Sequence, residues 1–218
     1  MSRKSRILIV DDHPIVRQGF AQLINQEPDL TVCAEVDTGA RAFDAAGTAT
    51  PDLAVVDIAL PGASGLELIK NIKAAYPELR VLVLSMHDET LYAERALRAG
   101  AQGYIMKQEA TDKVLEAIRR VLAGDVYLSE QMSARLLHHL VGVGPLPSAS
   151  PIERLSDREL EVFRLIGQGH STRQIAEQLN LGVKTVETYR AHIMEKLNLQ
   201  NATELVQRAF QWAQTEGM

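Results

Sequence analysis

The sequence predicts an α/β domain with a doubly wound, five-stranded parallel sheet, followed by a small all-helical domain of four helices. Three observations support this prediction. Apolar runs of strand length alternate with amphipathic segments up to residue 123, and a Gly/Pro/Ser-rich stretch follows at 142–151. Beyond that stretch the pattern is helical only. Alternating strands and helices are typical of a parallel sheet with helices on both faces.

Five short segments predict the strands. Ile7–Val10 and Leu53–Val56 are unbroken apolar runs, which is typical of strands buried on both faces of a sheet. The remaining strands are predicted at Thr31–Val36, Val81–Leu84 and Gly103–Met106. Pro61 and Gly62 form a turn signal shortly after the third strand.

The segments between the strands have helical periodicity. Pro14 suits a first helical turn, where its fixed φ and missing N–H cost least, and one face of that helix carries Val16, Phe20, Leu23 and Ile24. Further helices are predicted at Thr38–Ala46, Gly65–Ala75, Glu89–Arg98, Asp112–Ala123 and Ser129–Val141.

Polar side chains stand at the ends of four predicted strands, namely Asp11 with Asp12, Asp57, Ser85 and Lys107. Because parallel strands end at one edge of a sheet, we expect these side chains to lie close together. Three neighbouring carboxylates repel one another unless a cation is present, and Mg²⁺ is bound by carboxylates together with phosphate oxygens. For any one of these residues a helix cap or a solvated side chain is the simpler interpretation. Their convergence favours a phosphoryl site.

Capping boxes predict two helix starts in the C-terminal segment, at Ser156–Glu159 and Ser171–Gln174. A short helix after the second box, a tight turn at Asn180–Gly182 and a longer helix at Val183–Leu197 have the spacing of a helix-turn-helix. In that motif the second helix enters the major groove of DNA. A fourth helix is predicted from Asn201.

Residues 5–123 resemble the receiver domains of two-component response regulators, which have the flavodoxin-like fold, through Asp11-Asp12, Asp57, Ser85, Tyr104 and Lys107. Residues 155–216 resemble LuxR-type DNA-binding domains, through Leu155-Ser156-x-Arg158-Glu159, Gly169-x-Ser171, Ile175-Ala176, Val183-Lys184-Thr185-Val186 and Lys196-Leu197. Residues 124–154 then form a linker with one helix. The two resemblances in this order indicate a response regulator of the NarL/FixJ type.

The receiver resemblance implies a role for each residue at the strand ends. Asp57 is expected to accept a phosphoryl group from a sensor histidine kinase. Asp12, Asp57 and the backbone carbonyl of Ala59 are expected to hold Mg²⁺, with Asp11 reaching the ion through water.

The same resemblance assigns the remaining residues. Lys107 is expected to pair with the phosphoryl oxygens, Ser85 to donate its hydroxyl to one of them, and Tyr104 to change rotamer in response. Ala59 and His87 resemble positions that tune the lifetime of the phosphoryl group, although an ordinary loop histidine is the simpler interpretation of His87.

A helical wheel of 183–197 places Val186, Ile193 and Leu197 inward. The candidate DNA-contacting residues are Lys184, Thr185, Glu187, Thr188, Ala191, Arg173, Arg190 and Lys196. Lys184, Thr185 and Thr188 are the groove candidates, and Arg173 and Lys196 are the phosphate candidates. Arg190 lies near the buried stripe and either extends along it or points at the DNA backbone. Glu187 either accepts a hydrogen bond from a cytosine amino group or weakens the attraction to phosphates.

The charge of the C-terminal segment points to a homodimer on double-stranded DNA. Residues 151–218 carry 8 Lys and Arg against 9 Asp and Glu, a net charge of −1, so a monomer should bind DNA weakly. The last helix carries an apolar sector wider than one core requires, formed by Leu205, Val206, Ala209, Phe210, Trp212 and Ala213. The excess would face a second copy, unless Trp212 only covers the end of the domain.

The chain has one cysteine, Cys33, and no apolar run near the roughly 18 residues of a membrane span, so we expect a cytoplasmic protein without a membrane partner. We expect a transcription regulator switched by phosphorylation of Asp57, and not an enzyme. Two alternatives stay open. One is a DNA-binding regulator that works without phosphorylation. The other is an aspartyl-phosphate phosphotransferase, for which the sequence offers no second substrate pocket.

Overall fold

The computed structural model describes residues 3–60, 64–109, 111–141 and 150–216. The chain divides into two units, Met1–Leu137 and His138–Met218, which are described one at a time. The turn predicted at Pro61 and Gly62, and most of the predicted Gly/Pro/Ser stretch, lie outside the described residues. None of the helices that are described is long and apolar enough to cross a membrane.

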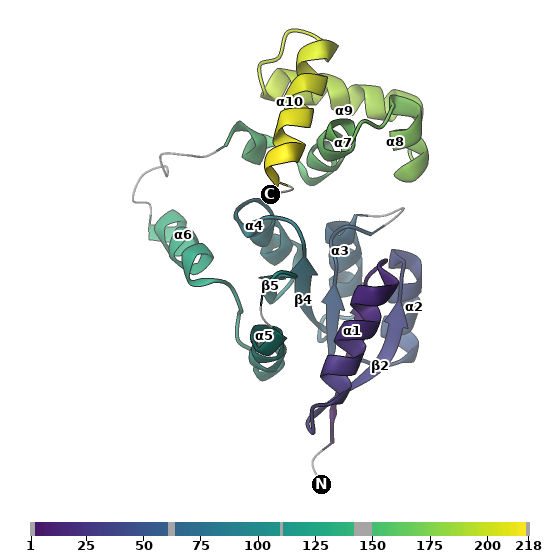
Figure 1. Cartoon of the computed structure of the whole chain (residues 1–218), viewed down its shortest axis with the longest axis vertical. Helices are drawn as coiled ribbons and strands as arrows, with labels where there is room; N and C mark the ends of the chain where they lie inside the picture. The colour runs from purple at the N-terminus through teal and green to yellow at the C-terminus, as the bar shows by residue number, and fades with distance from the viewer. Residues whose placement is uncertain (1–2, 61–63, 110, 142–149, 217–218) are drawn as a thin grey trace. The chain divides into compact units, whose positions relative to one another are not determined.

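The N-terminal unit is built on a five-stranded parallel sheet with the order β2-β1-β3-β4-β5 (Figure 1). The strands are β1 (Ser5–Val10), β2 (Leu30–Val36), β3 (Leu53–Val56), β4 (Arg80–Ser85) and β5 (Gly103–Met106). This order is that of the flavodoxin-like doubly wound fold, so the predicted fold class is confirmed. Each predicted strand is present. The bounds of β1 begin two residues earlier than predicted, and those of the other strands differ by at most one residue.

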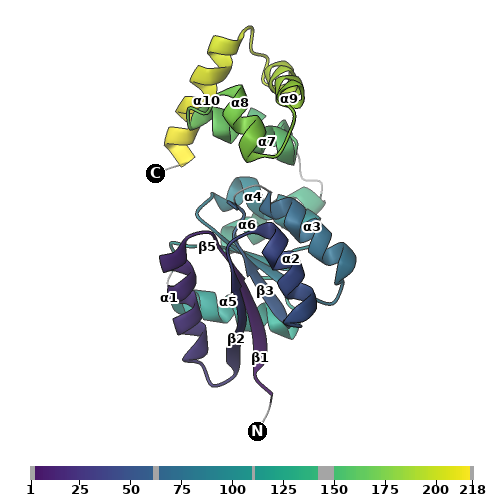
Figure 2. The same ribbon diagram turned by 90° about the vertical axis from the view of Figure 1, so that its right-hand side faces the viewer.

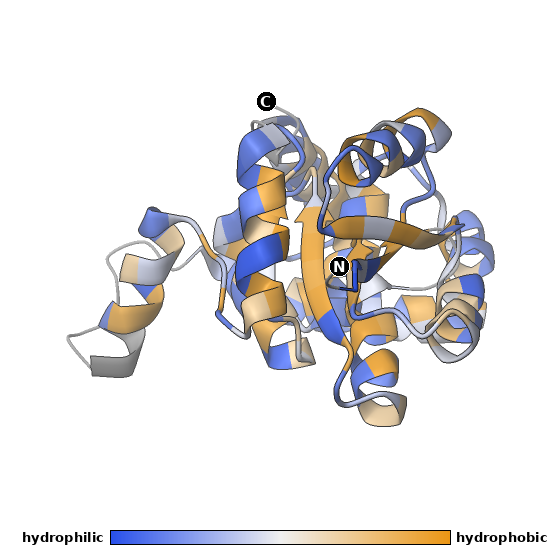
Figure 3. Cartoon of the chain, turned by 90° about the horizontal axis from the view of Figure 1, so that it is seen from below, coloured by the Kyte–Doolittle hydropathy of each residue, from blue (hydrophilic) through white to orange (hydrophobic). Residues whose placement is uncertain are grey.

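Five helices accompany the sheet in the described part of this unit: α1 (Pro14–Asn25), α2 (Gly39–Thr48), α3 (Gly65–Ala75), α4 (Glu89–Ala99) and α5 (Thr111–Ala123). A sixth, α6 (Glu130–Val141), begins in this unit and continues beyond Leu137. Helices α1 and α5 lie on one face of the sheet, and α2, α3 and α4 lie on the other (Figure 2). Figure 3 shows the apolar strands between helices whose apolar sides face them. Helix α6 buries Met132, whereas Leu137 is exposed.

The sheet core follows from the two-residue period of a strand. Ile7 and Ile9 of β1 belong to one cluster with Ile24 of α1 and Ile118 of α5. Leu8, between them, is fully buried on the opposite face. Because β1 and β3 are buried on both faces, the charged residues that follow them sit at the edge of the core.

The C-terminal unit contains a 3-10 turn at Pro151–Arg154 and the helices α7 (Asp157–Gly167), α8 (Thr172–Gln178), α9 (Val183–Lys196) and α10 (Ala202–Glu216). Both predicted capping boxes are present. A third one, between Ser150 and Glu153, closes the 3-10 turn inside the segment predicted as a linker. Asn180 adopts a left-handed conformation, with φ of 53°, in the turn between α8 and α9. That turn produces the helix-turn-helix predicted from the sequence.

The core of the C-terminal unit depends on a close crossing of α7 and α10. A Cβ atom added at Gly167 would lie 2.4 Å from the carbonyl oxygen of Ala209, so only glycine fits there. Phe163 is fully buried, and its ring lies 5.4 Å from that of Trp212. Trp212 therefore packs on the core of its own unit, which agrees with the interpretation that it covers the end of the domain.

Candidate functional site

The candidate site lies where the strand order of the sheet reverses, between β1 and β3. Val10 and Val56 are register partners at the carboxyl ends of these strands, and the Asp57 amide donates to the Val10 carbonyl at 2.9 Å. In doubly wound sheets, ligands bind at this switch point. Asp11 and Asp57 follow the two strands directly, and each is 2% exposed.

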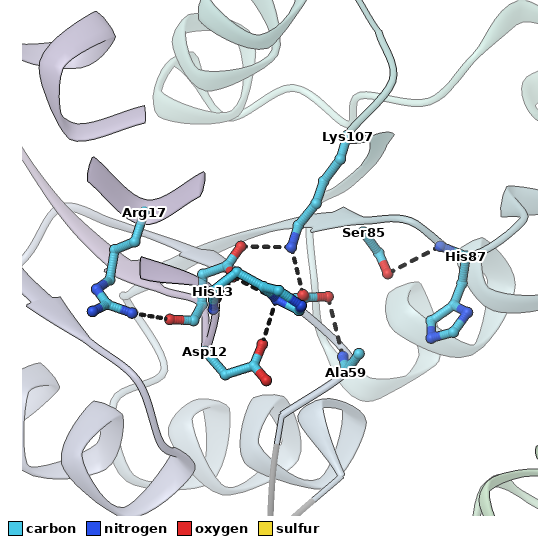
Figure 4. A network of polar contacts seen from close by, with 9 residues as sticks. Asp12, His13, Arg17, Ala59, Ser85, His87 and Lys107 are labelled. Carbon is cyan, nitrogen blue, oxygen red and sulfur yellow. Dashed lines mark hydrogen bonds and ion pairs between the residues drawn. The ribbon is translucent and has the colours of Figure 1, made fainter. Parts of the chain in front are cut away.

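Lys107 connects the two buried carboxylates. Its Nζ lies 2.6 Å from Asp11 Oδ2 and 2.6 Å from Asp57 Oδ2, and its side chain is only 5% exposed (Figure 4). Burial lowers the pKa of Lys107, but the Asp57 and Asp11 carboxylates raise it by more, so the pKa lies above its ordinary value. The Lys107 amide donates to the Ser85 carbonyl at 2.8 Å, which ties the ends of β5 and β4 together.

The second oxygens of the same carboxylates face backbone amides. Asp57 Oδ1 accepts a hydrogen bond from the Ala59 amide at 3.1 Å, and Asp11 Oδ1 accepts one from the His13 amide at 2.9 Å. Arg17 donates to the Asp11 carbonyl at 2.6 Å. Each buried carboxylate is therefore fixed by an ammonium on one side and an amide on the other.

The residues at this edge fit a divalent cation. Ligand atoms of Asp11, Asp12, His13 and Asp57 all lie within 4.8 Å of one another. Asp12 Oδ1 is buried and accepts no hydrogen bond from the described residues. Buried carboxylate oxygens without a donor are costly unless a cation balances them, and Mg²⁺ is bound by oxygen ligands of this kind.

Ser85 and Tyr104 converge on one backbone position. Ser85 is fully buried, and its hydroxyl oxygen accepts a hydrogen bond from the His87 amide at 3.3 Å. The Tyr104 hydroxyl, which is also buried, donates to the His87 carbonyl at 2.7 Å. The His87 ring stacks on Tyr92 of α4, with 4.8 Å between the ring centroids. The β4–α4 loop is thus connected to the site residue Ser85 and to Tyr104 of β5.

Gly65 positions the start of α3 against the end of β3. A Cβ atom at this position would lie 2.5 Å from Ile58 Cα and 2.7 Å from the Asp57 carbonyl oxygen. The Gly65 amide donates to the Ile58 carbonyl at 3.1 Å. This contact of backbone with backbone requires glycine. The sequence pattern contained Gly65 only as a helix start and did not reveal this role.

Helix α9 presents the predicted surface. Val186 and Ile193 are fully buried, and the exposed residues are Lys184, Thr185, Glu187, Thr188 and Ala191. Arg173 on α8 is exposed, and Arg190 is half-buried. Gly182 occupies the N-cap and forms no side-chain cap hydrogen bond.

Lys196 has a different environment from the one expected of a phosphate contact. Its Nζ lies 2.6 Å from Glu159 Oε2, and the Glu159 side chain is 5% exposed. Burial raises the pKa of Glu159, but hydrogen bonds from Lys196 and Ser156 outweigh it and hold the pKa below its ordinary value. The helical wheel gave the direction of Lys196 but not this partner on α7.

Comparison with known proteins supports both halves of the chain. Residues 7–119 match the family described as the response regulator receiver domain, and residues 153–209 match the bacterial regulatory proteins of the LuxR family. The oxygen regulatory protein NreC of Staphylococcus carnosus is 37% identical over 208 residues, covering 94% of this chain and 96% of NreC.

Solved structures agree with these matches. RcsB of Salmonella enterica serovar Typhimurium, bound to the promoter rprA in the presence of the phosphomimetic BeF3-, is 27% identical, with a TM-score of 0.69 over 94% of this chain and 98% of RcsB. A LuxR-family response regulator from Aurantimonas is 35% identical, with a TM-score of 0.59 over 63% of this chain and 99% of the other.

The sheet-edge site and these matches define the class: the chain belongs to the two-component response regulators. A LuxR-type helix-turn-helix follows the receiver domain, and the NreC relatives extend over nearly the whole chain. Within the class, it is therefore a response regulator of the NarL/FixJ type.

Proposed function

We propose that this chain is a transcription regulator that a sensor histidine kinase switches by phosphorylating Asp57. The observation that carries the proposal is the placement of Asp57: it is buried at the switch point, with its Oδ2 2.6 Å from Lys107 Nζ. A carboxylate held in this way has a fixed orientation toward an incoming phosphorus atom.

The chemistry follows from the groups around Asp57. A carboxylate oxygen of Asp57 attacks the phosphorus of a phosphohistidine that carries a proton on its other ring nitrogen, the P–N bond breaks, and the imidazole leaves as the neutral ring. Asp11, Asp12 and Asp57 would hold Mg²⁺, which supplies positive charge to the phosphoryl oxygens. Lys107, already 2.6 Å from Asp57, neutralises a further part of the added charge.

The response to phosphorylation runs through His87. Ser85 turns its hydroxyl to a phosphoryl oxygen, which loosens its 3.3 Å hydrogen bond to the His87 amide. Tyr104 holds the carbonyl of the same residue, so the β4–α4 loop and Tyr104 repack together. These contacts support the predicted rotamer change of Tyr104.

Intact-mass measurement tests the phosphoacceptor. The full chain is incubated with acetyl phosphate and Mg²⁺, alongside Asp57→Asn. We expect one added phosphoryl mass on the wild type and none on the variant. Mass added equally to both would show that another residue is the acceptor. Sustained hydrolysis of phosphoesters would instead favour the phosphotransferase.

We also propose that α9 binds the major groove, with Lys184, Thr185 and Thr188 contacting bases or backbone. All three are exposed near the start of the helix, and RcsB, a structural relative, was solved on promoter DNA. Lys184→Ala should weaken binding to a fragment selected from random DNA and reduce the salt dependence. Glu195→Ala, on the same helix, is the matched control and should not weaken binding. Equal losses from both variants would argue against this contact.

The dimer is proposed to form through α10. Val206 and Phe210 are 45% and 53% exposed there, although both are apolar. In sedimentation, Phe210→Lys should lower the protein bound per DNA fragment from two chains to one, whereas Phe43→Lys, which changes an exposed phenylalanine of the receiver unit, should not. A dimer retained by Phe210→Lys would place the interface elsewhere. Asp57→Ala on the same DNA tests the phosphorylation-independent alternative, which predicts unchanged affinity.

A further inference from the structure

His13 lies beside the acidic pocket, and its ring contacts the pocket instead of capping its helix. It is the N-cap residue of α1, yet its side chain forms no cap hydrogen bond. The ring instead turns toward the neighbouring carboxylates, with Nδ1 2.7 Å from Asp12 Oδ1 and 3.3 Å from Asp11 Oδ1. Figure 4 shows the ring over the centre of the pocket, between Asp12 and Lys107.

The spacing of these atoms is that of ligands on one metal ion. Two donor atoms on adjacent corners of an octahedral site lie about 3 Å apart, because each bond is about 2.1 Å long. The two distances from His13 Nδ1, 2.7 and 3.3 Å, fall on either side of this value. The wider set, which includes Asp57, fits within 4.8 Å.

A second observation comes from Asp12. Its Oδ1 atom is buried and accepts no hydrogen bond from the residues described, although His13 Nδ1 is its near neighbour. An aligned N–H would satisfy this oxygen. An imidazolium ring at this distance would form an ion pair with Asp12, whereas a neutral ring that turns its Nδ1 lone pair to the pocket needs a cation between the two atoms, as metal ligands do.

We propose that His13 Nδ1 is a fourth side-chain ligand of this pocket, and that it makes the pocket favour divalent transition metals such as Co²⁺ over Mg²⁺. Mg²⁺ takes oxygen ligands, whereas imidazole nitrogen suits the later first-row ions and raises affinity along the Irving–Williams order. The inference rests on the proposed function only in taking this pocket as the cation site. It adds which ion the chain selects and which residue selects it.

Calorimetric titration of the metal-free full chain with CoCl₂ and with MgCl₂ tests the proposal. His13→Asn keeps a favourable N-cap, so it should fold. We expect its Co²⁺ affinity to fall by about tenfold or more, as for loss of groups that support a metal, and its Mg²⁺ affinity to change by less than twofold. His138→Asn, which replaces an exposed histidine of α6, should leave both affinities unchanged.

Pulsed EPR of the Mn²⁺-loaded chain adds a direct signature. The wild type should show strong coupling to a ¹⁴N nucleus, and His13→Asn should lack it. If His13→Asn leaves the Co²⁺ affinity unchanged, the inference is overturned. It is also overturned if the variant binds Co²⁺ more tightly, because the His13 ring would then compete with the ion for Asp12. If the wild type still gains the phosphoryl mass in Mg²⁺, the proposed function stands even though the inference fails. If the wild type binds neither metal, the inference and the proposed function are both contradicted.

Discussion

Each unit of the chain buries a carboxylate against a lysine, and the two pairs differ in their charge balance. In the receiver unit, Lys107 is 2.6 Å from both Asp11 and Asp57. In the C-terminal unit, Lys196 is 2.6 Å from Glu159. Lys107 faces more carboxylates than it can neutralise, because Asp12 shares the pocket with Asp11 and Asp57. Lys196 faces the single carboxylate of Glu159.

The difference distinguishes a reactive site from a structural contact. Glu159 also accepts a hydrogen bond from the Ser156 amide at 2.7 Å, so its carboxylate is used to cap α7 and to connect α7 with α9. In the receiver unit, a buried oxygen of Asp12 accepts no hydrogen bond from the described residues, and His13 Nδ1 lies 2.7 Å from it. A surplus of buried negative charge therefore marks the place where a cation and a phosphoryl group are expected.

The largest effect should come from Lys107→Met. Removing the lysine leaves two buried carboxylates without a counter-charge, which should cost the receiver unit about 3 kcal/mol of unfolding free energy in EDTA. Lys196→Met should cost the C-terminal unit about 1 kcal/mol or less, since the Lys196 side chain is 39% exposed. Urea unfolding separates the two units, because the one tryptophan, Trp212, reports on the C-terminal unit and circular dichroism on both. Equal losses of unfolding free energy from Lys107→Met and Lys196→Met would show that the two ion pairs do not differ in this way.

Gly167→Ala tests whether the C-terminal unit depends on backbone packing more than on its ion pair. The added methyl group would meet the Ala209 carbonyl, so we expect a loss of about 1–3 kcal/mol, seen by Trp212 fluorescence. Gly19→Ala in α1 is the control, since nothing lies within 4 Å of its added methyl. That variant should stabilise the receiver unit by about 0.5–1 kcal/mol. A neutral Gly167→Ala would contradict the close crossing.

A smaller loss is expected from Ser171→Ala. The Ser171 hydroxyl caps α8, with Gln174 completing the box, and loss of such a cap costs about 1 kcal/mol. The effect should appear in Trp212 fluorescence and leave the receiver transition in place. A shift of the receiver transition by the same amount would mean that the two units unfold together.

The smallest effects at neutral pH concern titration, and they have opposite signs in the two units. The pKa of Glu159 is lowered on folding, so its contribution is present above about pH 4.3 and is lost as the pH falls through the folded pKa. The pKa of Lys107 is raised, so its contribution is present below about pH 10.4 and is lost as the pH rises. In urea unfolding at a series of pH values, Glu159→Gln should reduce the loss of unfolding free energy at acid pH for the C-terminal unit only. An unchanged loss at acid pH would show that Glu159 does not cause it.

The sequence predicted the elements well because their signals are local. Unbroken apolar runs located β1 and β3, and the boxes at Ser156 and Ser171 located α7 and α8. The box at Ser150 was missed, although its Ser-x-x-Glu signal is present, because the surrounding composition indicated a linker.

Partners across the fold were harder to predict. The ends of parallel strands predicted that Asp11, Asp57 and Lys107 would meet, and they do. The direction of the His13 ring and the pairing of Lys196 depend on packing between elements, which neither periodicity nor spacing contains.

The contact between Gly65 and Ile58 also limits the entropy of the segment that carries Ala59. The chain leaves β3 at Asp57 and is joined to itself again at Gly65, through the amide bonded to the Ile58 carbonyl. A residue held in this way has fewer conformations to give up when a ligand binds beside it. Ile58, the residue before Ala59, is therefore fixed against α3 before any ion or phosphoryl group arrives, and the free energy of that ordering belongs to folding instead of binding.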